Sequence, residues 1–293
     1  MRTAYLGTSE FAATVLRRLA ASSHKPSLVV TPPDSRRGRG RRELPPPAAV
    51  AATELSLPLL QSADVNDEAA LAKIHAAGPE VVVVCAFGQL IREPLLSDFL
   101  LLNVHPSLLP RWRGAAPIER AIMAADAETG TCIMRLTAGL DSGPVALWER
   151  VALGPEDDFA GLSEKLATLS GDLLVRALDL QAVGKLELTE QDEAAVTYAE
   201  KIDPAERRID PTRPAAAEAA RVRALTPHVG AYLELAGDER LGVKRARATA
   251  QPDGPLAIPC GEGWLALDLV QPPGGKPMAA DAYLRGHEPP VPA

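Results

Sequence analysis

The sequence predicts an α/β fold in which a parallel-sheet domain is followed by a small β-barrel domain. Over residues 1–183, short β-branched and aliphatic runs alternate with segments of helical periodicity, which is typical of βαβ units. Over residues 205–293, one helical segment precedes short strand-like segments separated by turn residues, which favours a barrel. The polar, weakly patterned residues 184–204 indicate a linker between them. A chain of 293 residues is long enough for two domains, each with its own core.

The expected elements follow from the period of the apolar residues along the chain. In the first domain the expected strands are Thr3–Leu6, Leu28–Thr31, Val81–Ala86, Leu101–His105, Thr131–Arg135 and Val145–Val151. The expected helices are Glu10–Ala21, Glu68–Ala77, Ile118–Ala125 and Leu162–Ala182. In the second domain we expect a helix over Ala215–Leu225 and strands over Ala231–Leu235, Gly242–Arg247, Leu256–Pro259 and Trp264–Leu269.

Composition and cysteine usage indicate a soluble cytoplasmic protein without a metal site. The longest apolar runs, such as Val81–Phe87, are far too short to cross a bilayer, so no membrane association is expected. The N-terminus enters a strand directly and shows no export signal. Cys85, Cys132 and Cys260 stand alone and far apart, which predicts neither a disulfide framework nor a CxxC metal site.

Charge is distributed unevenly along the chain. The net charge is −7, and residues 201–293 contain 12 basic and 12 acidic residues, so all of the excess negative charge lies in residues 1–200. That acidic part nevertheless contains five arginines within seven residues, Arg36, Arg37, Arg39, Arg41 and Arg42, followed by three prolines. Such a run must face either solvent or a polyanion. An ordinary solvated loop remains an alternative for this run.

A candidate catalytic pair lies at the end of one predicted strand. Asn103 and His105 are two residues apart, so their side chains share one face of the strand while Val104 faces the other. Pro106 ends the strand and places both residues at its carboxyl end, where open α/β sheets bind ligands. A histidine and an asparagine can hydrogen-bond a developing oxyanion, and the histidine can also carry a proton. A structural histidine buried after the strand is the competing interpretation.

A candidate carboxylate lies in the turn-rich segment 137–144, where Asp141 is the only acid. A carboxylate beside an imidazole orients the ring and favours its charged form. An ordinary turn residue between two glycines is the alternative. The sequence contains no nucleophile elbow, because Ser107 lies beside Pro106 and among apolar residues. The substrate is therefore expected to supply the nucleophile. The first βα turn, Gly7–Phe11, contains a single glycine and argues against a dinucleotide cofactor.

Two motifs carry a family resemblance. The run NVHPSLLPRWRGAAPIERAI (103–122), together with GLDSG (139–143), resembles the active-site core of the formyltetrahydrofolate-dependent formyltransferases. GTSEFAA (7–13), VTYAEKI (196–202) and QPPGGKPMAADAYLRG (271–286) extend the resemblance to members that formylate initiator methionyl-tRNA. The departures are local: the residues after Asp34 read Ser-Arg-Arg, and His228 stands where a tryptophan often follows the proline.

The resemblance implies a fold, a reaction and a set of site residues. The fold would be a Rossmann-like catalytic domain (1–183), a linker (184–204) and an OB-like tRNA-binding domain (205–293). The reaction would move a formyl group from 10-formyltetrahydrofolate, without a metal, to the α-amino group of initiator methionyl-tRNA in translation initiation. The chain would act as a monomer. Catalysis would use Asn103, His105 and Asp141. The folate would lie against Phe87, Gly88, Ser107, Leu108, Leu109 and Pro110, and the tRNA against Arg36, Arg37, Arg39, Arg41 and Arg42.

Four other functions fit the sequence less well. Formyl-folate hydrolase domains and sugar-amine formyltransferases share the three catalytic residues, but they explain neither the arginine run nor the second domain as well. A non-catalytic RNA-binding protein would leave Asn103, His105 and Asp141 without a role. A dehydrogenase lacks its glycine fingerprint.

Overall fold

The computed structural model describes residues 1–37, 42–235 and 239–290 and contains two compact units. The first unit comprises residues 1–114, 130–151 and 163–198, and the second comprises residues 115–129, 152–162 and 199–293. Within the described residues no helix is long and apolar enough to cross a membrane. Besides residues 199–293, the second unit includes the two earlier segments 115–129 and 152–162.

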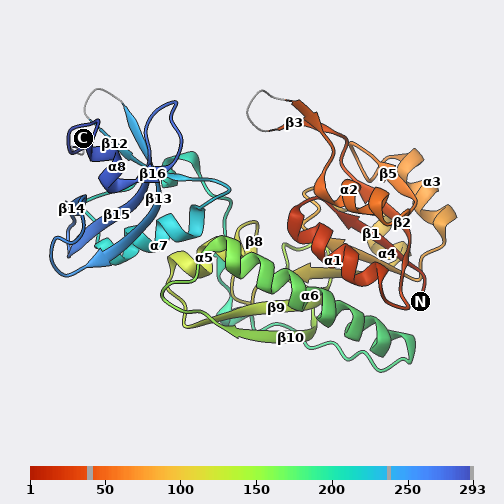
Figure 1. Ribbon diagram of the computed structural model, residues 1–293. Helices are drawn as coiled ribbons and strands as arrows, with labels where there is room; N and C mark the ends of the chain where they lie inside the picture. The colour runs from red at the N-terminus through yellow and green to blue at the C-terminus, as the bar shows by residue number, and fades with distance from the viewer. Residues whose placement is uncertain (38–41, 236–238, 291–293) are drawn as a thin grey trace. The chain divides into compact units, whose positions relative to one another are not determined.

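The first unit is built on a seven-stranded sheet of order β10-β9-β7-β6-β1-β2-β5 (Figure 1). Its strands are β1 (Thr3–Gly7), β2 (Pro26–Thr31), β5 (Leu59–Gln61), β6 (Val81–Cys85), β7 (Leu100–His105), β9 (Glu128–Arg135) and β10 (Val145–Ala152). The five strands from β7 to β5 pair in parallel. The chain leaves β1 toward β2 and β5 and then returns to β6 on the other side of β1. This reversal creates a switch point between β1 and β6.

Helices cover both faces of this sheet. They are α1 (Glu10–Ala20), α2 (Pro47–Glu54), α3 (Glu68–Ala77), α4 (Leu95–Asp98) and α6 (Phe159–Ala182). Buried residues of α1, α2 and α6 pack against Tyr5, Val83 and Leu102 on one face. Residues of α3 and α4 pack against Ala4 and Leu6 on the other. This alternation along each strand is what a sheet buried on both faces requires.

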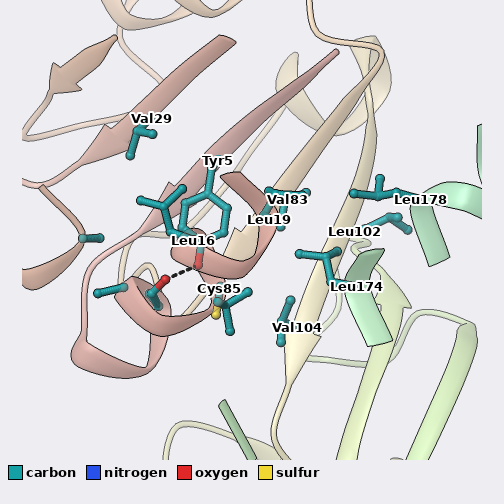
Figure 2. Close-up of a cluster of buried hydrophobic side chains, with 14 of the residues drawn as sticks. Tyr5, Leu16, Leu19, Val29, Val83, Cys85, Leu102, Val104, Leu174 and Leu178 are labelled. Atoms are coloured by element: carbon teal, nitrogen blue, oxygen red, sulfur yellow. Dashed lines mark hydrogen bonds between the residues drawn. The ribbon is translucent and has the colours of Figure 1, made fainter. Parts of the chain in front are cut away.

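Tyr5 lies at the centre of the first of these layers (Figure 2). Its hydroxyl is fully buried and donates a 2.6 Å hydrogen bond to the carbonyl of Ala12 in α1. Burial raises the pKa of this phenol well above its usual value, so the hydroxyl stays protonated and keeps donating. A buried polar group that has a partner ties the first helix to the sheet without a desolvation cost.

The parallel sheet expected from the sequence is confirmed for the five strands from β7 to β5 but does not extend to β9. β9 pairs with β7 in antiparallel orientation, with Asn103 opposite Met134 and His105 opposite Cys132. A parallel return needs a crossover helix packed on the sheet. The helix between these strands, α5 (Pro117–Met123), instead packs against α7 (Ala215–Leu225) in the second unit.

Several short elements escaped prediction. The arginine run forms part of a two-stranded antiparallel hairpin, β3 (Ser35–Arg37) and β4 (Arg42–Leu44). The segment expected as a linker contains a 3₁₀ turn, η1 (Glu193–Ala195), and β11 (Tyr198–Ala199), which pairs with β8 (Arg113–Gly114). Its Thr189 also exchanges backbone hydrogen bonds with Val145. Residues 189–198 are therefore bound to the first unit.

The second unit contains an antiparallel sheet of order β12-β13-β15-β14, with β16 on β15. The strands are β12 (Ala231–Glu234), β13 (Arg240–Thr249), β14 (Ala257–Pro259), β15 (Trp264–Gln271) and β16 (Met278–Ala279). α7 packs on β13 and β15, and α8 (Ala280–Leu284) also packs on β15. Within the described residues the outer strands β12 and β14 do not pair with each other, so no closed barrel forms. The OB-like barrel stays a prediction.

His228 keeps an aromatic contact within the second unit. Its ring stacks on Phe159 with centroids 3.6 Å apart, and its Nε2 lies 2.9 Å from Oε1 of Glu119 in α5. The imidazole therefore supplies both a flat face and a polar atom at the position where the family resemblance led us to expect tryptophan.

Arg120 of α5 makes a two-fold ion pair with Glu206 in the 3₁₀ turn η2 (Pro204–Arg207). Its Nη1 and Nη2 donate to the two carboxylate oxygens at 2.5 and 2.9 Å. Its Nε and Nη2 also donate to the carbonyl of Glu200. The hydrogen bonds from Arg120 hold the pKa of Glu206 below its usual value.

We predict that Glu206→Gln lowers the free energy of unfolding at pH 7 by about 1.5–3 kcal/mol, because a charge-assisted hydrogen bond is lost. A carboxyl whose pKa is lower in the folded state stabilises the fold above its unfolded pKa of about 4.3. The difference between wild type and Glu206→Gln should therefore be full at neutral pH and vanish as the pH falls through the folded pKa. Urea titrations at several pH values measure it.

Glu54→Gln is the matched control, because Glu54 pairs with Arg17 on the surface at 2.9 Å. Exposed pairs contribute about 0–1 kcal/mol. A Glu206→Gln variant as stable as this control, or a difference that persists at low pH, would contradict the assignment.

Candidate active site

The expected site residues gather at the carboxyl edge of the parallel strands. β1, β6 and β7 are neighbours and run in the same direction. The segments that follow them, which begin at Thr8, Ala86 and Pro106, therefore meet at one edge of the sheet, beside the switch point. One hydrogen bond already joins two of these segments, since the Thr8 hydroxyl donates to the carbonyl of Phe87 at 2.6 Å.

Asn103 and His105 share one face of β7, as their spacing predicts. Val104 lies between them and belongs to the buried cluster on the opposite face. Asn103 is 8% exposed and His105 is 4% exposed. Both side chains are therefore held in a largely dry environment, where electrostatic interactions are stronger than in water.

Asp141 is brought against this pair by the GLDSG loop. Asn103 Nδ2 donates to Asp141 Oδ1 at 3.3 Å, and the backbone N–H of Gly114 donates to Asp141 Oδ2 at 2.9 Å. His105 Nδ1 lies 3.6 Å from the same Oδ2. The structure thus brings together the three residues that the sequence singled out, from segments 38 residues apart.

The His105 ring is held from its other side as well. Its Nε2 lies 2.9 Å from the carbonyl oxygen of Trp112. Because a carbonyl oxygen only accepts, Nε2 carries a proton in this arrangement. Both ring nitrogens then face oxygen acceptors, one neutral and one anionic. The Nδ1 atom is directed toward the Asp141 carboxylate.

Asn103 keeps hydrogen-bonding capacity to spare. Among the described residues, only Asp141 forms a hydrogen bond with its side chain, and that bond uses one of the two amide hydrogens. The second amide hydrogen can therefore donate to an incoming carbonyl oxygen. An uncharged donor of this kind can stabilise negative charge that develops during a reaction.

The backbone around the site adopts uncommon conformations. Ala86, Trp112 and Asp141 have φ values of 44°, 67° and 44°, in the left-handed region that residues with a side chain rarely adopt. A Cβ at Gly143 would overlap the carbonyl oxygen of Arg135, so only glycine fits there. Strained backbone concentrates where surrounding structure holds functional groups in place.

The residues expected to hold folate divide into two groups. Gly88 has φ = 81°, and a side-chain atom added there would meet nothing within 4 Å, so the space beside it is open. The Ser107 hydroxyl is fully buried and donates to the carbonyl of Arg111 at 2.6 Å, and Leu109 packs on Cys132, Met134 and Val145. Ser107 and Leu109 therefore shape the loop from within. The remaining members of the set are Phe87, which is buried, and Leu108 and Pro110, which are half-buried.

The arginines of the hairpin are described in part. Arg36 and Arg42 are exposed. The register places Arg36 opposite Glu43 and Arg37 opposite Arg42. Arg39 and Arg41 lie outside the described residues. Like charges at opposed positions of a hairpin are unfavourable unless a partner of opposite charge is present.

The sequence reasoning missed a group of residues behind the site. Gln191 Nε2 donates to the carbonyls of Asp141 and Gly143 at 2.8 and 2.7 Å. The backbone N–H of Trp112 donates to Thr197 Oγ1 at 2.9 Å. Thr197 lies in the VTYAEKI motif, which did signal importance, whereas nothing in the composition around Gln191 marked it.

Neither buried cysteine near the site is reactive. Burial raises the pKa of the Cys85 and Cys132 thiols to about 12, so both stay protonated. No group of three or more potential metal-binding side chains occurs in the part of the chain that the structure describes.

Comparison with known proteins places this geometry in a family. Residues 1–178 match the family described as formyl transferase, and residues 201–288 match the formyl transferase C-terminal domain. A methionyl-tRNA formyltransferase of Parvibaculum lavamentivorans is 41% identical, with 98% of this chain and 97% of the relative covered. A methionyl-tRNA formyltransferase of Cereibacter sphaeroides is also 41% identical, with 98% and 96% covered.

Solved structures show the same fold at low identity. HypX from Aquifex aeolicus in complex with tetrahydrofolic acid has a TM-score of 0.69 at 16% identity, with 97% of this chain and 47% of that one covered. WlaRD, a sugar 3N-formyl transferase, has a TM-score of 0.67 at 13% identity, with 91% and 97% covered. The matched domains and the two full-length relatives lead to one conclusion: this chain belongs to the formyl transferase family and, within it, to the methionyl-tRNA formyltransferases.

Proposed function

We propose that this enzyme transfers a formyl group from 10-formyltetrahydrofolate to the α-amino group of initiator methionyl-tRNA and thereby supports translation initiation. The observation that carries the proposal is the carboxylate of Asp141, held against Asn103 and His105 at the ligand-binding edge of the sheet. Relatives 41% identical over nearly the full length of the chain carry the name of that reaction.

The donor folate is proposed to enter beside the switch point between β1 and β6. Gly88 leaves open space there, and the loop 106–110 borders the same edge. Phe87, Leu108 and Pro110 can contribute apolar contact, while the buried Ser107 and Leu109 keep the loop in shape. An apolar wall with a few directed polar groups is typical of sites for flat heteroaromatic ligands.

The acceptor amine is proposed to attack the formyl carbon without prior activation by a strong base. An α-amino group has a pKa of about 7.7–8.0, so part of it is already neutral near pH 7. As the new C–N bond forms, negative charge develops on the formyl oxygen. The second amide hydrogen of Asn103 can donate to that oxygen. His105, which shares the strand face with Asn103, is proposed to stabilise the same developing charge.

Proton transfer is assigned to Asp141. Its side chain is 14% exposed, so an incoming amine can reach it. The carboxylate can accept the proton that the attacking nitrogen must lose, and the departing folate nitrogen takes up one proton as its bond to the formyl carbon breaks. The proton count balances, because one is lost from the amine and one is gained by the leaving nitrogen.

The tRNA is proposed to contact the arginine hairpin through its acceptor arm. Arg36, Arg37 and Arg42 lie on the described strands, and Arg39 and Arg41, which belong to the same run in the sequence, lie outside the described residues. Guanidinium groups match phosphate geometry, and they reverse the repulsive field of an otherwise acidic unit. Residues 205–293 are proposed as an OB-like tRNA-binding domain that follows a catalytic domain (1–183) and a linker (184–204). The monomeric state and the cytoplasmic location remain predictions.

The proposed function is tested by incubating the purified chain with 10-formyltetrahydrofolate and aminoacylated tRNA. Formyl-methionine should appear on initiator methionyl-tRNA and far less on elongator methionyl-tRNA. Release of free formate without tRNA would indicate a hydrolase, and transfer only to an amino sugar would indicate a sugar-amine formyltransferase. Either result would overturn the proposal.

We predict that Asp141→Asn folds normally and lowers kcat by at least ~10²-fold, the usual scale for losing a positioned proton-transfer group. The amide keeps the size of the side chain but cannot accept the proton of the amine. Single-turnover formylation measures the effect. The control is Asp179→Asn, whose exposed carboxylate binds His24 on the first unit, and it should keep near-normal activity. Normal kcat in Asp141→Asn would remove this residue from the mechanism.

We predict that replacing Arg36 and Arg42 together by alanine weakens the use of tRNA and leaves folate binding intact. Each lost phosphate contact should reduce the salt dependence of tRNA binding by a slope of about one. Formylation against tRNA concentration at several salt concentrations, with a parallel folate titration, measures this. Arg18→Ala, which removes one exposed charge from α1, is the control. An unchanged tRNA dependence, or a defect in folate binding alone, would mean that the hairpin is an ordinary solvated surface and does not bind tRNA.

A further inference from the structure

The loop that carries Asp141 is held by the side chain of Gln191, a residue outside the loop. Asp141 adopts φ = 44°, which a residue with a side chain keeps only under constraint. Gln191 Nε2 donates to the carbonyl of Asp141 at 2.8 Å and to that of Gly143 at 2.7 Å. The two hydrogens of the Gln191 carboxamide therefore bind the backbone carbonyls of Asp141 and Gly143.

The orientation of this carboxamide is itself determined. Gln191 Oε1 accepts a 3.0 Å hydrogen bond from Arg113 Nε. A flipped amide would place its oxygen against two carbonyl oxygens and its hydrogens against a guanidinium, so only one orientation satisfies all the partners. Arg113 is 3% exposed, and its Nη2 binds Oε1 of Glu193 at 2.6 Å. Its charge is therefore buried but paired.

The same short strand holds Asp141 at a second point. Gly114 follows Arg113 in β8, and its N–H donates to Asp141 Oδ2. Gly114 thus binds the carboxylate of Asp141, and Gln191 binds its backbone carbonyl. All of these residues belong to the first unit, so the arrangement is complete within one compact part of the fold.

We propose that Gln191, which lies in the segment expected to be a linker, is a positioning residue for Asp141. It acts by fixing the backbone of residues 139–143, which keeps the carboxylate against Asn103 and His105. Arg113 acts one step further back by orienting Gln191. The proposal rests on the proposed function and adds a determinant of its rate. A misplacement of a reacting group by about 1 Å can cost ~10²-fold in rate.

Gln191→Glu is the test variant, because it keeps the size of the side chain and its contact with Arg113 but removes both donors. The carboxylate would face two carbonyl oxygens and push the loop away. We expect kcat to fall at least ~10-fold while KM for tRNA and for folate stays within about 2-fold, since binding groups are untouched. Normal kcat in a folded Gln191→Glu variant overturns the proposal.

The double variant Asp141→Asn/Gln191→Glu separates positioning from general destabilisation. If Gln191 acts through Asp141, its replacement should cost less than about 2-fold further once the carboxylate is gone, because effects of coupled residues do not add. The same loss of kcat in both backgrounds would mean that Gln191 only supports the fold, and the proposal would fail.

Two further variants complete the experiment. Asn66→Asp removes a comparable 2.9 Å bond from a carboxamide to the carbonyl of Leu90 in the first unit, and it should leave kcat unchanged. If Gln191→Glu fails to fold by circular dichroism, Arg113→Lys, which loses the Nε donor, takes its place under the same criteria. Wild-type activity is measured in parallel. A wild-type chain without formylation refutes the proposed function, whereas active wild type with equally active variants refutes only the role of Gln191.

Discussion

The candidate site depends on the placement of one carboxylate by donors from separate stretches of chain. Asn103 comes from β7, Gly114 from β8, and Asp141 from the loop after β9. Withdrawing a carboxylate from water carries a cost that only hydrogen bonds and nearby positive charge can offset. The two donors, the amide of Asn103 and the backbone N–H of Gly114, provide that compensation. They also leave the carboxylate accessible enough to accept a proton.

The cores on both faces of the sheet allow the loops at its edge to be strained. Tyr5, Val83 and Leu102 lie in a close-packed layer under α1 and α6, and the opposite face is equally buried. A rigid scaffold of this kind can hold Ala86, Trp112 and Asp141 in left-handed conformations that would relax in a mobile loop. Each of these three residues lies in a segment that borders the proposed folate and amine positions.

The motif NVHPSLLPRWRGAAPIERAI (103–122) contributes residues to both units of the chain. Its first part supplies Arg113 and Gly114, which hold the GLDSG loop of the first unit. Its second part is α5, whose Glu119 and Arg120 bind His228 and Glu206 within the second unit.

The sequence by itself determined the elements whose signals are local. The period of apolar residues located the main strands and helices of the first unit, and the helix Ala215–Leu225 matches residue for residue. The alternation along a strand put Asn103 and His105 on one face, and proline placed them at its end. The local turn pattern left Asp141 open between an ordinary turn residue and a catalytic acid, and the family resemblance of the GLDSG motif decided in favour of the acid.

Only the tertiary structure decided the features that depend on contacts between distant residues. The antiparallel direction of β9 accompanies the packing of α5 on α7, and no local sequence pattern records either feature. The second sheet has open edges because its outer strands β12 and β14 do not pair with each other in the described chain. Gln191 binds carbonyls 48 and 50 residues away through a side chain that is unremarkable in sequence. A hydrogen bond to a backbone carbonyl needs geometry and leaves no compositional signature, so its role could be found only once the chain was folded.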